Sequence, residues 1–533
     1  MAEEQLAFAR KASGLVRGLS FFDAFLVGFM NQGILPNLWW VITLGVGIFF
    51  GANIIVAAIL ALVIVGFSFP LVWGILGGTM PRSGGEYIYN SRIIHPIVGL
   101  LESWGNAWVW IFWIYILAPW VVDIAMVGMA DQMGWTRLSE FCTATWGRLL
   151  VFTVVNVAGF LTIAFGIKIM ARVQKVVFAI TTAGVVVMLI IMSMYSKADF
   201  VAKWDAMAAE HGSLTYDQVV PAVAAAVGSD LPTSWNWVDT LGLLVAATYL
   251  FAYAYCITYV SGEVKRPDKT IILANLTAIV IPGIFLLWTG FAMYHLLDFD
   301  FISATAYIDL EGGVEGYTFP FLPNVMGLTF VLVPEAWLSV LLALAYSLVC
   351  YWWVVLSYLA SPRIMFAWGL DRMGPRWFSD VNPRWASPVK NYVAVLVISQ
   401  ILLTVYPFVG EEMQGYTVTG LEWLTVYGTT AVAAILIPYR GRCRSIWEAS
   451  PYKTWTFLGV PLVTWGGIVA VSYIALLFYF FIIRSELREI TALSLVMYGV
   501  IYATGLVWYL YFRWQNKAKG VDLGVTYGEL PPE

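Results

Sequence analysis

The stretch between residues 238 and 270 has the composition of a membrane helix with a polar centre. Its apolar run begins at Val238, becomes polar and aromatic from Phe251 to Tyr255, and ends in a charged string. In lipid every backbone amide must be bonded within the protein, so a helix unwinds only where it lines a cavity. The freed N–H and C=O groups can then bind a solute. The chemistry predicted here is therefore non-covalent recognition of a small molecule on a transport pathway.

A second interrupted stretch lies near the start of the chain. Residues 19–47 are too long for one straight crossing, and Asn31, Gln32, Gly33 and Pro36 fall in their middle. Glycine and proline favour a broken helix there. Broken helices at matching positions of two inverted halves indicate a solute site between them, near the middle of the membrane.

The composition indicates a polytopic membrane protein. Of 533 residues, 60% are hydrophobic and 12% are charged, and the mean hydropathy is +0.79. Such a chain cannot cover itself with a water-facing surface. Apolar stretches recur at the ~20-residue length that a bilayer crossing needs, and we count about twelve of them. The expected fold is all-α, with the interrupted spans 1 and 6 beginning two five-span units of opposite orientation.

The expected organisation has six parts. They are an N-terminal tail (1–18), spans 1–5 as a first repeat (19–195), an external link (196–237), spans 6–10 as an inverted second repeat (238–440), spans 11 and 12 (441–513), and a C-terminal tail (514–533).

Basic residues are concentrated on one side of the expected membrane. Of 29 Lys and Arg, only six fall in links on the other side: Arg137, Arg148, Lys197, Lys203, Arg484 and Arg488. Because cytoplasmic links carry the excess of Lys and Arg, this bias predicts that both termini are cytoplasmic. The expected location is the cytoplasmic membrane.

The sequence gives no support to an enzyme. The four cysteines form no CxxC pair, and His95, His211 and His295 are scattered. No catalytic triad, metal-ligand cluster or phosphate-binding loop is recognisable, so we expect no metal and no cofactor other than a coupling ion. A non-transporting membrane subunit is the alternative from another class, although a structural role would not need two broken helices.

Three stretches resemble amino acid permeases of the amino acid-polyamine-organocation (APC) superfamily. They are residues 81–96, 251–271 and 361–388, which occur in the same order and at matching spacing. The resemblance covers roughly residues 14–445. It implies the five-plus-five inverted-repeat fold shared with sodium-coupled leucine transporters, and transport by alternating access.

The resemblance also implies where a substrate binds. In the family, backbone amides at the break in span 1 meet the substrate carboxylate, and carbonyls at the breaks in spans 1 and 6 meet its ammonium. The corresponding positions here are Asn31, Gln32, Gly33, Ile34, Phe251, Tyr253, Ala254 and Tyr255. The span 1 break departs from the family pattern, because a Gly-x-Gly type run is replaced by one with a single glycine. Each group of side chains also has a structural alternative. Asn31 and Gln32 either contact the solute or form hydrogen bonds between helices. The tyrosines either line the cavity or are packing and membrane-interface residues.

Three residues are candidates for ion coupling. Thr181 and Thr182 occupy the place in span 5 where some family members carry a lysine instead of a sodium ion, so their hydroxyls either ligate Na+ or bond within their own helix. Glu102, about one turn into span 3, either carries a proton or lies at the inner interface. Asp123 and Asp23 are expected at interfacial or capping positions. Coupling to Na+, coupling to H+ and exchange are all left open.

Charged residues suggest a gate and bear on the substrate. Glu263, Lys265 and Arg266 form either a cytoplasmic gate with the basic links or an ordinary solvated helix end. The middles of spans 1, 3, 6, 8 and 10 lack Lys and Arg, and Glu422 is expected at the outer end of span 10. A charged substrate side chain would lack a partner, so a neutral amino acid is expected. The atypical span 1 break suggests an amine, a polyamine or an inorganic cation as the alternative. No nucleic acid partner is expected, and the oligomeric state is open.

Overall fold

The computed structural model describes residues 15, 17–409, 416–484 and 492–530. Among them, 11 helical segments are long and apolar enough to cross a membrane, or up to 12 if a bent pair counts as one span. This confirms the expected all-α polytopic fold. The expected tail at 1–18 lies almost wholly outside the described residues.

The candidate spans combine α-helices with short π or 3-10 segments, which are labelled η. In chain order they are Phe21–Val46 (α2 Phe21–Asn31, α3 Ile34–Trp40, η1 Val41–Val46), Ile54–Thr79 (α4 Ile54–Phe69, η2 Pro70–Gly74, α5 Ile75–Thr79), Pro96–Gln132 (α7 Pro96–Trp120, η3 Val121–Met126, α8 Val127–Gln132), α10 Thr145–Ala164, α11 Ile167–Met194, Trp237–Glu263 (α14 Trp237–Ala252, η4 Tyr253–Glu263), α15 Pro267–Leu296, α18 Ala336–Leu370, α19 Val389–Val409, α20 Tyr416–Leu436, α22 Leu462–Ile483 and α23 Ala492–Ala518.

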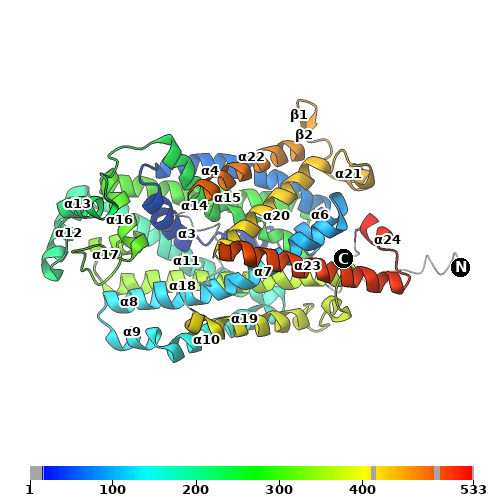
Figure 1. The fold of residues 1–533 in the computed structure, drawn as a ribbon, viewed down its shortest axis with the longest axis horizontal. Coiled ribbons are helices and arrows are strands. Elements are labelled where there is room, and N and C mark those ends of the chain that lie inside the picture. Colours follow the sequence, from blue (N-terminus) through cyan, green and yellow to red (C-terminus); the bar gives the residue numbers. More distant parts are fainter. Residues whose placement is uncertain (1–14, 16, 410–415, 485–491, 531–533) are drawn as a thin grey trace.

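Shorter elements gather at the two ends of the helix bundle (Figure 1). Near one end lie α9 Thr136–Thr143, α12 Lys197–His211, α13 Tyr216–Val227, α16 Phe299–Glu311 and α17 Val325–Leu332. Toward the other end lie α6 Glu86–Ile93, η5 Arg376–Ser379, η7 Gly441–Cys443, α21 Arg444–Glu448, a hairpin of β1 Thr456–Phe457 and β2 Val460–Pro461, and α24 Leu523–Gly528. The second end is the one on which the sequence concentrates Lys and Arg.

Both predicted interruptions are present. In span 1, Gln32 and Gly33 separate α2 from α3, and Gly33 has a φ of 47°, a left-handed conformation that glycine adopts without a steric penalty. In span 6 the α-helix gives way at Tyr253 to the 3-10 segment η4, and Val260 inside it departs from helical geometry. The inverted-repeat relation between the two halves stays a prediction.

Two buried ion pairs tie elements together at the basic end. Arg92 of α6 donates two hydrogen bonds to Asp371, of 2.6 and 2.8 Å. Arg363 of α18 donates from Nε to Glu263 at 2.8 Å and from Nη1 to the Tyr392 hydroxyl at 2.9 Å. All four charged side chains are at most 1% exposed. Because a buried charge that loses its partner is strongly destabilising, these pairs hold this end of the bundle in its present arrangement.

We predict that Asp371→Asn destabilises the protein far more than loss of a surface ion pair. The variant leaves Arg92 buried without its counter-charge, which costs about 3–5 kcal/mol. Lys390→Gln is the matched control, because Lys390 pairs with Asp380 at 2.5 Å while both side chains are at least half exposed, and such pairs contribute about 0–1 kcal/mol. The thermal unfolding midpoint of each purified protein in detergent measures the difference. Equal shifts for the two variants would contradict this account.

Candidate substrate-binding site

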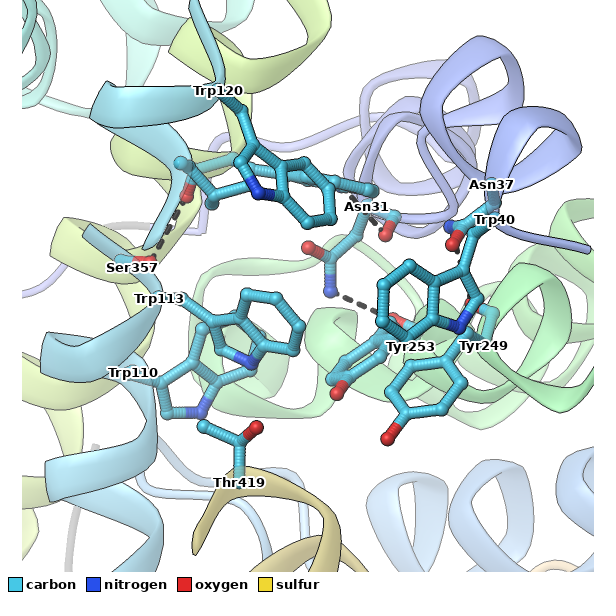
Figure 2. Close-up of a pocket in the computed structure, with 12 residues that line it drawn as sticks. Asn31, Asn37, Trp40, Trp110, Trp113, Trp120, Tyr249, Tyr253, Ser357 and Thr419 are labelled. Carbon is cyan, nitrogen blue, oxygen red and sulfur yellow. Dashed lines mark hydrogen bonds between the residues drawn. The ribbon is translucent and has the colours of Figure 1, made fainter. Parts of the chain in front are cut away.

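An aromatic cavity lies between the two broken spans and three further helices, α7, α18 and α20. Seven of the twelve residues that line it are Trp or Tyr, and none carries a formal charge. They are Asn31, Asn37, Trp40, Trp110, Trp113, Leu117, Trp120, Tyr249, Tyr253, Trp353, Ser357 and Thr419. In Figure 2, Trp110 and Trp113 face Tyr249, Tyr253 and Trp40 across the cavity, with Asn31 between them.

The tryptophans of α7 form one wall of the cavity because of their spacing. Trp110, Trp113 and Trp120 recur at intervals that place them along one face of a helix. The rings of Trp110 and Trp113 meet the Tyr253 ring edge to face, with centroids 6.1 and 5.9 Å apart. Aromatic faces of this kind accept either an apolar side chain or a cation.

The cavity is small in this conformation. Its volume is about 30 Å³, whereas a single water needs a cavity of roughly 10–15 Å³ on the same measure. The cavity therefore holds at most a few waters. Binding of an amino acid requires the aromatic side chains to move apart.

The side-chain amides of Asn31 and Gln32 connect the two breaks. Asn31 Nδ2 donates to the Tyr253 carbonyl at 3.0 Å, and Gln32 Nε2 donates to the Phe251 carbonyl at 3.1 Å. On the opposite side, Trp353 Nε1 donates to the Asn31 carbonyl at 2.8 Å. The hydrogen bonding between helices that was one of the two possible roles of these amides is thus present. A solute ammonium that binds the same two carbonyls must share them with these amides or displace them.

The eight predicted substrate-binding residues do not all meet in one place. Asn31 and Tyr253 line the aromatic cavity, whereas Gly33 and Ile34 line a separate, smaller cavity. The other four, Gln32, Phe251, Ala254 and Tyr255, are buried and line neither cavity.

Most of the aromatic wall was missed by the analysis of the sequence. Trp110 and Trp113 could have been found from their three-residue spacing in an apolar stretch. Trp353 gives no such signal, because Trp352 beside it is equally apolar and only the packing shows which ring reaches the break in span 1.

Gly33 fits between the two cavities only because it lacks a side chain. A Cβ atom at this position would lie 1.9 Å from Cζ2 of Trp353. The positive φ adds strain for any other residue. The close approach of α2 and α3 to α18 therefore depends on this glycine.

The smaller cavity contains the predicted threonines. It has a volume of about 10 Å³ and is lined by Thr181, Thr182, Met30, Gly33 and residues around them. The Thr181 hydroxyl donates to the Phe178 carbonyl of its own helix at 3.2 Å. The buried Thr182 hydroxyl has no hydrogen-bond partner among the described residues. The volume suits one water or one monovalent cation.

Glu102 lies in a group of buried carboxyls. Neither of its oxygens makes a hydrogen bond of standard geometry within the described chain, and the charges that act on it are those of Glu86 and Glu422. Glu422 was expected at the outer end of span 10, and that expectation is wrong. The side chain is fully buried against Gly105 of α7, where a Cβ atom would lie 1.9 Å from Glu422 Oε1. Glu422 also lies one helical turn from Thr419, which lines the aromatic cavity.

Of the two aspartates expected at interfacial or capping positions, Asp23 is found at a capping position, and Asp123 forms a partly exposed ion pair. Asp23 completes a capping box with Ser20 at the start of α2 and pairs with Lys175 at 2.9 Å. Asp123 pairs with Arg148 at 2.9 Å, and both side chains are about one third exposed.

Of the three predicted gate residues, only Glu263 is buried and forms an ion pair within the described chain. It is paired with Arg363, as described above, and its carbonyl accepts from the backbone N–H groups of Gly18 and Leu19 at 2.9 and 3.0 Å. Lys265 and Arg266 are exposed and make no ion pair with any described residue. The gate hypothesis therefore rests on Glu263 and Arg363.

An acidic cavity lies at the opposite end of the bundle from the Glu263–Arg363 ion pair. It measures about 390 Å³, and Asp123, Asp131 and Asp309 are among its lining residues. Asp309 accepts hydrogen bonds from Trp39 Nε1 at 2.8 Å and from the Thr43 hydroxyl. Burial raises the pKa of Asp309, although these hydrogen bonds oppose the shift. Since Trp39 lines this cavity and its neighbour Trp40 lines the aromatic one, the two cavities are adjacent.

The apolar helices of the described chain define a polytopic membrane protein. Within this class, the family model described as "Amino acid permease" matches residues 19–510. The chain therefore belongs to the amino acid permease family, which consists of transporters rather than enzymes.

One curated relative adds detail. The chain is 24% identical over 217 residues to "Cationic amino acid transporter 4, vacuolar" from Arabidopsis thaliana. The match spans 40% of this chain and 32% of that protein.

We predict that Gly33→Ala abolishes transport while the protein stays folded. A left-handed alanine costs about 1–2 kcal/mol, and its Cβ displaces Trp353 from the wall of the cavity. Gly428→Ala is the control, because a Cβ there meets nothing within 4 Å. Uptake into liposomes, with size-exclusion chromatography as the test of folding, measures the effect. Unchanged uptake by Gly33→Ala would show that this break is not the site.

Proposed function

We propose that this protein is a secondary active transporter that moves a neutral amino acid across the cytoplasmic membrane by alternating access. The observation that carries the proposal is the uncharged aromatic cavity between the breaks of spans 1 and 6. A zwitterion needs donors for its carboxylate and acceptors for its ammonium, and helix breaks provide both. The absence of charge from the described lining favours an uncharged side chain.

The break in span 1 supplies the donors for the carboxylate, and the break in span 6 supplies the acceptors for the ammonium. The start of α3 presents backbone N–H groups to an anion, with the left-handed Gly33 exposing them. The Tyr253 and Phe251 carbonyls, now bonded to Asn31 and Gln32, are the acceptors for the ammonium. Exchange of an amide donor for an ammonium donor keeps both carbonyls satisfied. This exchange also removes two bonds that join the break in span 1 to span 6, which links substrate binding to relative movement of the two spans.

The gate at the basic end completes the alternating-access proposal. The bond between Arg363 and Glu263 joins α18 to the end of span 6, and backbone bonds join the same end to the residues before span 1. Opening toward this side requires these contacts to break. The concentration of Lys and Arg supports a cytoplasmic position for this end and for both termini.

A cationic substrate is the second candidate, and the position of Glu422 favours it. Its carboxyl is buried one turn from the cavity and close to α7, so a cationic side chain that passes Thr419 would find a partner. The aromatic wall suits a cation as well, and the acidic outer cavity would attract one. The relative's name points in the same direction.

Two sites are proposed for ion coupling. The cavity at Thr181 and Thr182 fits Na+, because it has the volume of one ion and the Thr182 hydroxyl is available as an oxygen ligand. Glu102 fits H+, because a buried carboxyl without a cationic partner is costly to ionise. Transport depends on a Na+ gradient in the first case and on a proton gradient in the second.

Uptake by purified protein in liposomes tests the function. We expect radiolabelled neutral amino acids to accumulate when a Na+ or H+ gradient is imposed, and leucine or phenylalanine to compete better than arginine or lysine. Better competition by arginine or lysine than by leucine or phenylalanine, with loss of that preference in Glu422→Gln, would establish the cationic candidate. No flux of any amino acid, under either gradient or with preloaded amino acid, would contradict both.

Two variants distinguish the coupling ions. If Na+ binds at the threonines, Thr182→Val abolishes the stimulation by Na+, whereas Thr182→Ser retains it. If H+ binds at Glu102, Glu102→Gln abolishes accumulation driven by a proton gradient but leaves exchange intact. Thr277→Val is the control, because that hydroxyl donates only within its own helix. Unaltered coupling in both Thr182→Val and Glu102→Gln would exclude both sites.

A further inference from the structure

A pocket with basic walls lies at the end of the bundle that carries the gate, away from the substrate site. Its volume is about 430 Å³. It is formed where the start of α7, the segment after α20, the end of α23 and the C-terminal helix α24 come together, and Figure 1 shows α24 beside the end of α23. His95, Arg442 and Arg513 line it with two tyrosines, and no acidic side chain does so within the described chain.

The positive charges of this pocket are not neutralised by neighbouring carboxylates. Arg513 makes no ion pair or hydrogen bond with any described residue. Arg442 donates from Nε and Nη2 to the carbonyls of Arg92 and Ser91 at 2.6 and 3.0 Å, which leaves its Nη1 to the pocket. Asp522, the N-cap of α24, accepts from the Gly524 N–H at 2.7 Å and forms no ion pair with these arginines within the described chain. The pocket therefore presents excess positive charge.

His95 adds a neutral donor. Its Nδ1 accepts from the Ile97 N–H at 3.3 Å, so in the neutral ring the proton lies on Nε2. Partial burial lowers the pKa of His95, and the charges of Arg442, Arg440 and Arg513 lower it further.

The position of the pocket indicates the source of an anion. Tyr511 and Trp514 flank Arg513 on α23 and are 51% and 67% exposed. Exposed Trp and Tyr at the end of a membrane helix mark the level of the lipid headgroups. Arg513 is therefore at the depth of a lipid phosphate, and basic pockets between membrane helices bind anionic headgroups.

We infer that this pocket binds a phosphate group, supplied by the headgroup of an anionic phospholipid, through Arg513, Arg442 and the Nε2 of His95. A bidentate guanidinium matches the geometry of phosphate oxygens. A bound headgroup would also contact α24, whose Tyr527 hydroxyl lies 3.2 Å from that of Tyr87 in α6. Lipid binding then stabilises the position of the C-terminal helix against α6.

Titration of the full-length, delipidated protein in neutral detergent tests this inference. Short-chain phosphatidylglycerol, short-chain phosphatidylcholine and inorganic phosphate are compared by native mass spectrometry and by the thermal unfolding midpoint. We expect phosphatidylglycerol to bind most tightly. Arg513→Gln should weaken that binding about fivefold, the effect of removing about one basic residue at a membrane surface, and Arg513→Lys should recover most of it.

Lys517→Gln is the matched control, because it removes the same charge from the same helix at a residue that does not line the pocket. Since Arg513 makes no contact that the fold needs, its variants are expected to fold, as size-exclusion chromatography will show. Binding of inorganic phosphate that depends on Arg513, without any preference for phosphatidylglycerol over phosphatidylcholine, would overturn the lipid as the source. Equal binding of every anion by the wild type and Arg513→Gln would overturn the site.

Discussion

The satisfaction of backbone carbonyls at the break in span 6 is the constraint on which the rest of the site depends. A carbonyl that loses its helical partner in a membrane interior costs several kcal/mol if it stays unbonded. Here the amides of Asn31 and Gln32 donate to the carbonyls of Tyr253 and Phe251, at the point where α14 gives way to η4. This explains the atypical break in span 1, because a glycine at either position has no side chain to reach the facing span. The polar pair is thus part of the structure that a solute must rearrange.

The same two spans are joined again at the basic end of the bundle. There the Glu263 carbonyl accepts from Gly18 and Leu19, while the Glu263 side chain is held by Arg363. Spans 1 and 6 are therefore fastened at two levels along the membrane normal. Both levels include a residue of η4, Tyr253 at its start and Glu263 at its end. Such a pair of linked contacts is what a transporter needs to keep one gate closed while the other opens.

The sequence predicts local interruptions well and contacts between distant helices poorly. The breaks at Gly33 and Tyr253 depend on nearby residues, and the structure places both where the pattern indicates. Trp353 and Glu422 take their positions from the way α18 and α20 pack on α7, and no periodicity in either helix encodes that depth. For the same reason the sequence marks Glu263 as a candidate gate residue but does not single out its partner Arg363.

The buried position of Glu422 also constrains how substrate and ion can be combined. An unpaired carboxylate in this environment is strongly unfavourable, so the group is neutralised by a proton, by a hydrogen-bond donor or by a cation. Tyr502 donates to one oxygen at 2.9 Å, and the other has no partner among the described residues. A cationic substrate side chain bound there would supply the counter-charge to this carboxyl. A neutral substrate would leave that role to a proton or to a coupling ion. The charge of the substrate therefore decides whether Glu422 belongs to the substrate site, whereas the choice between Na+ and H+ concerns the threonine cavity and Glu102.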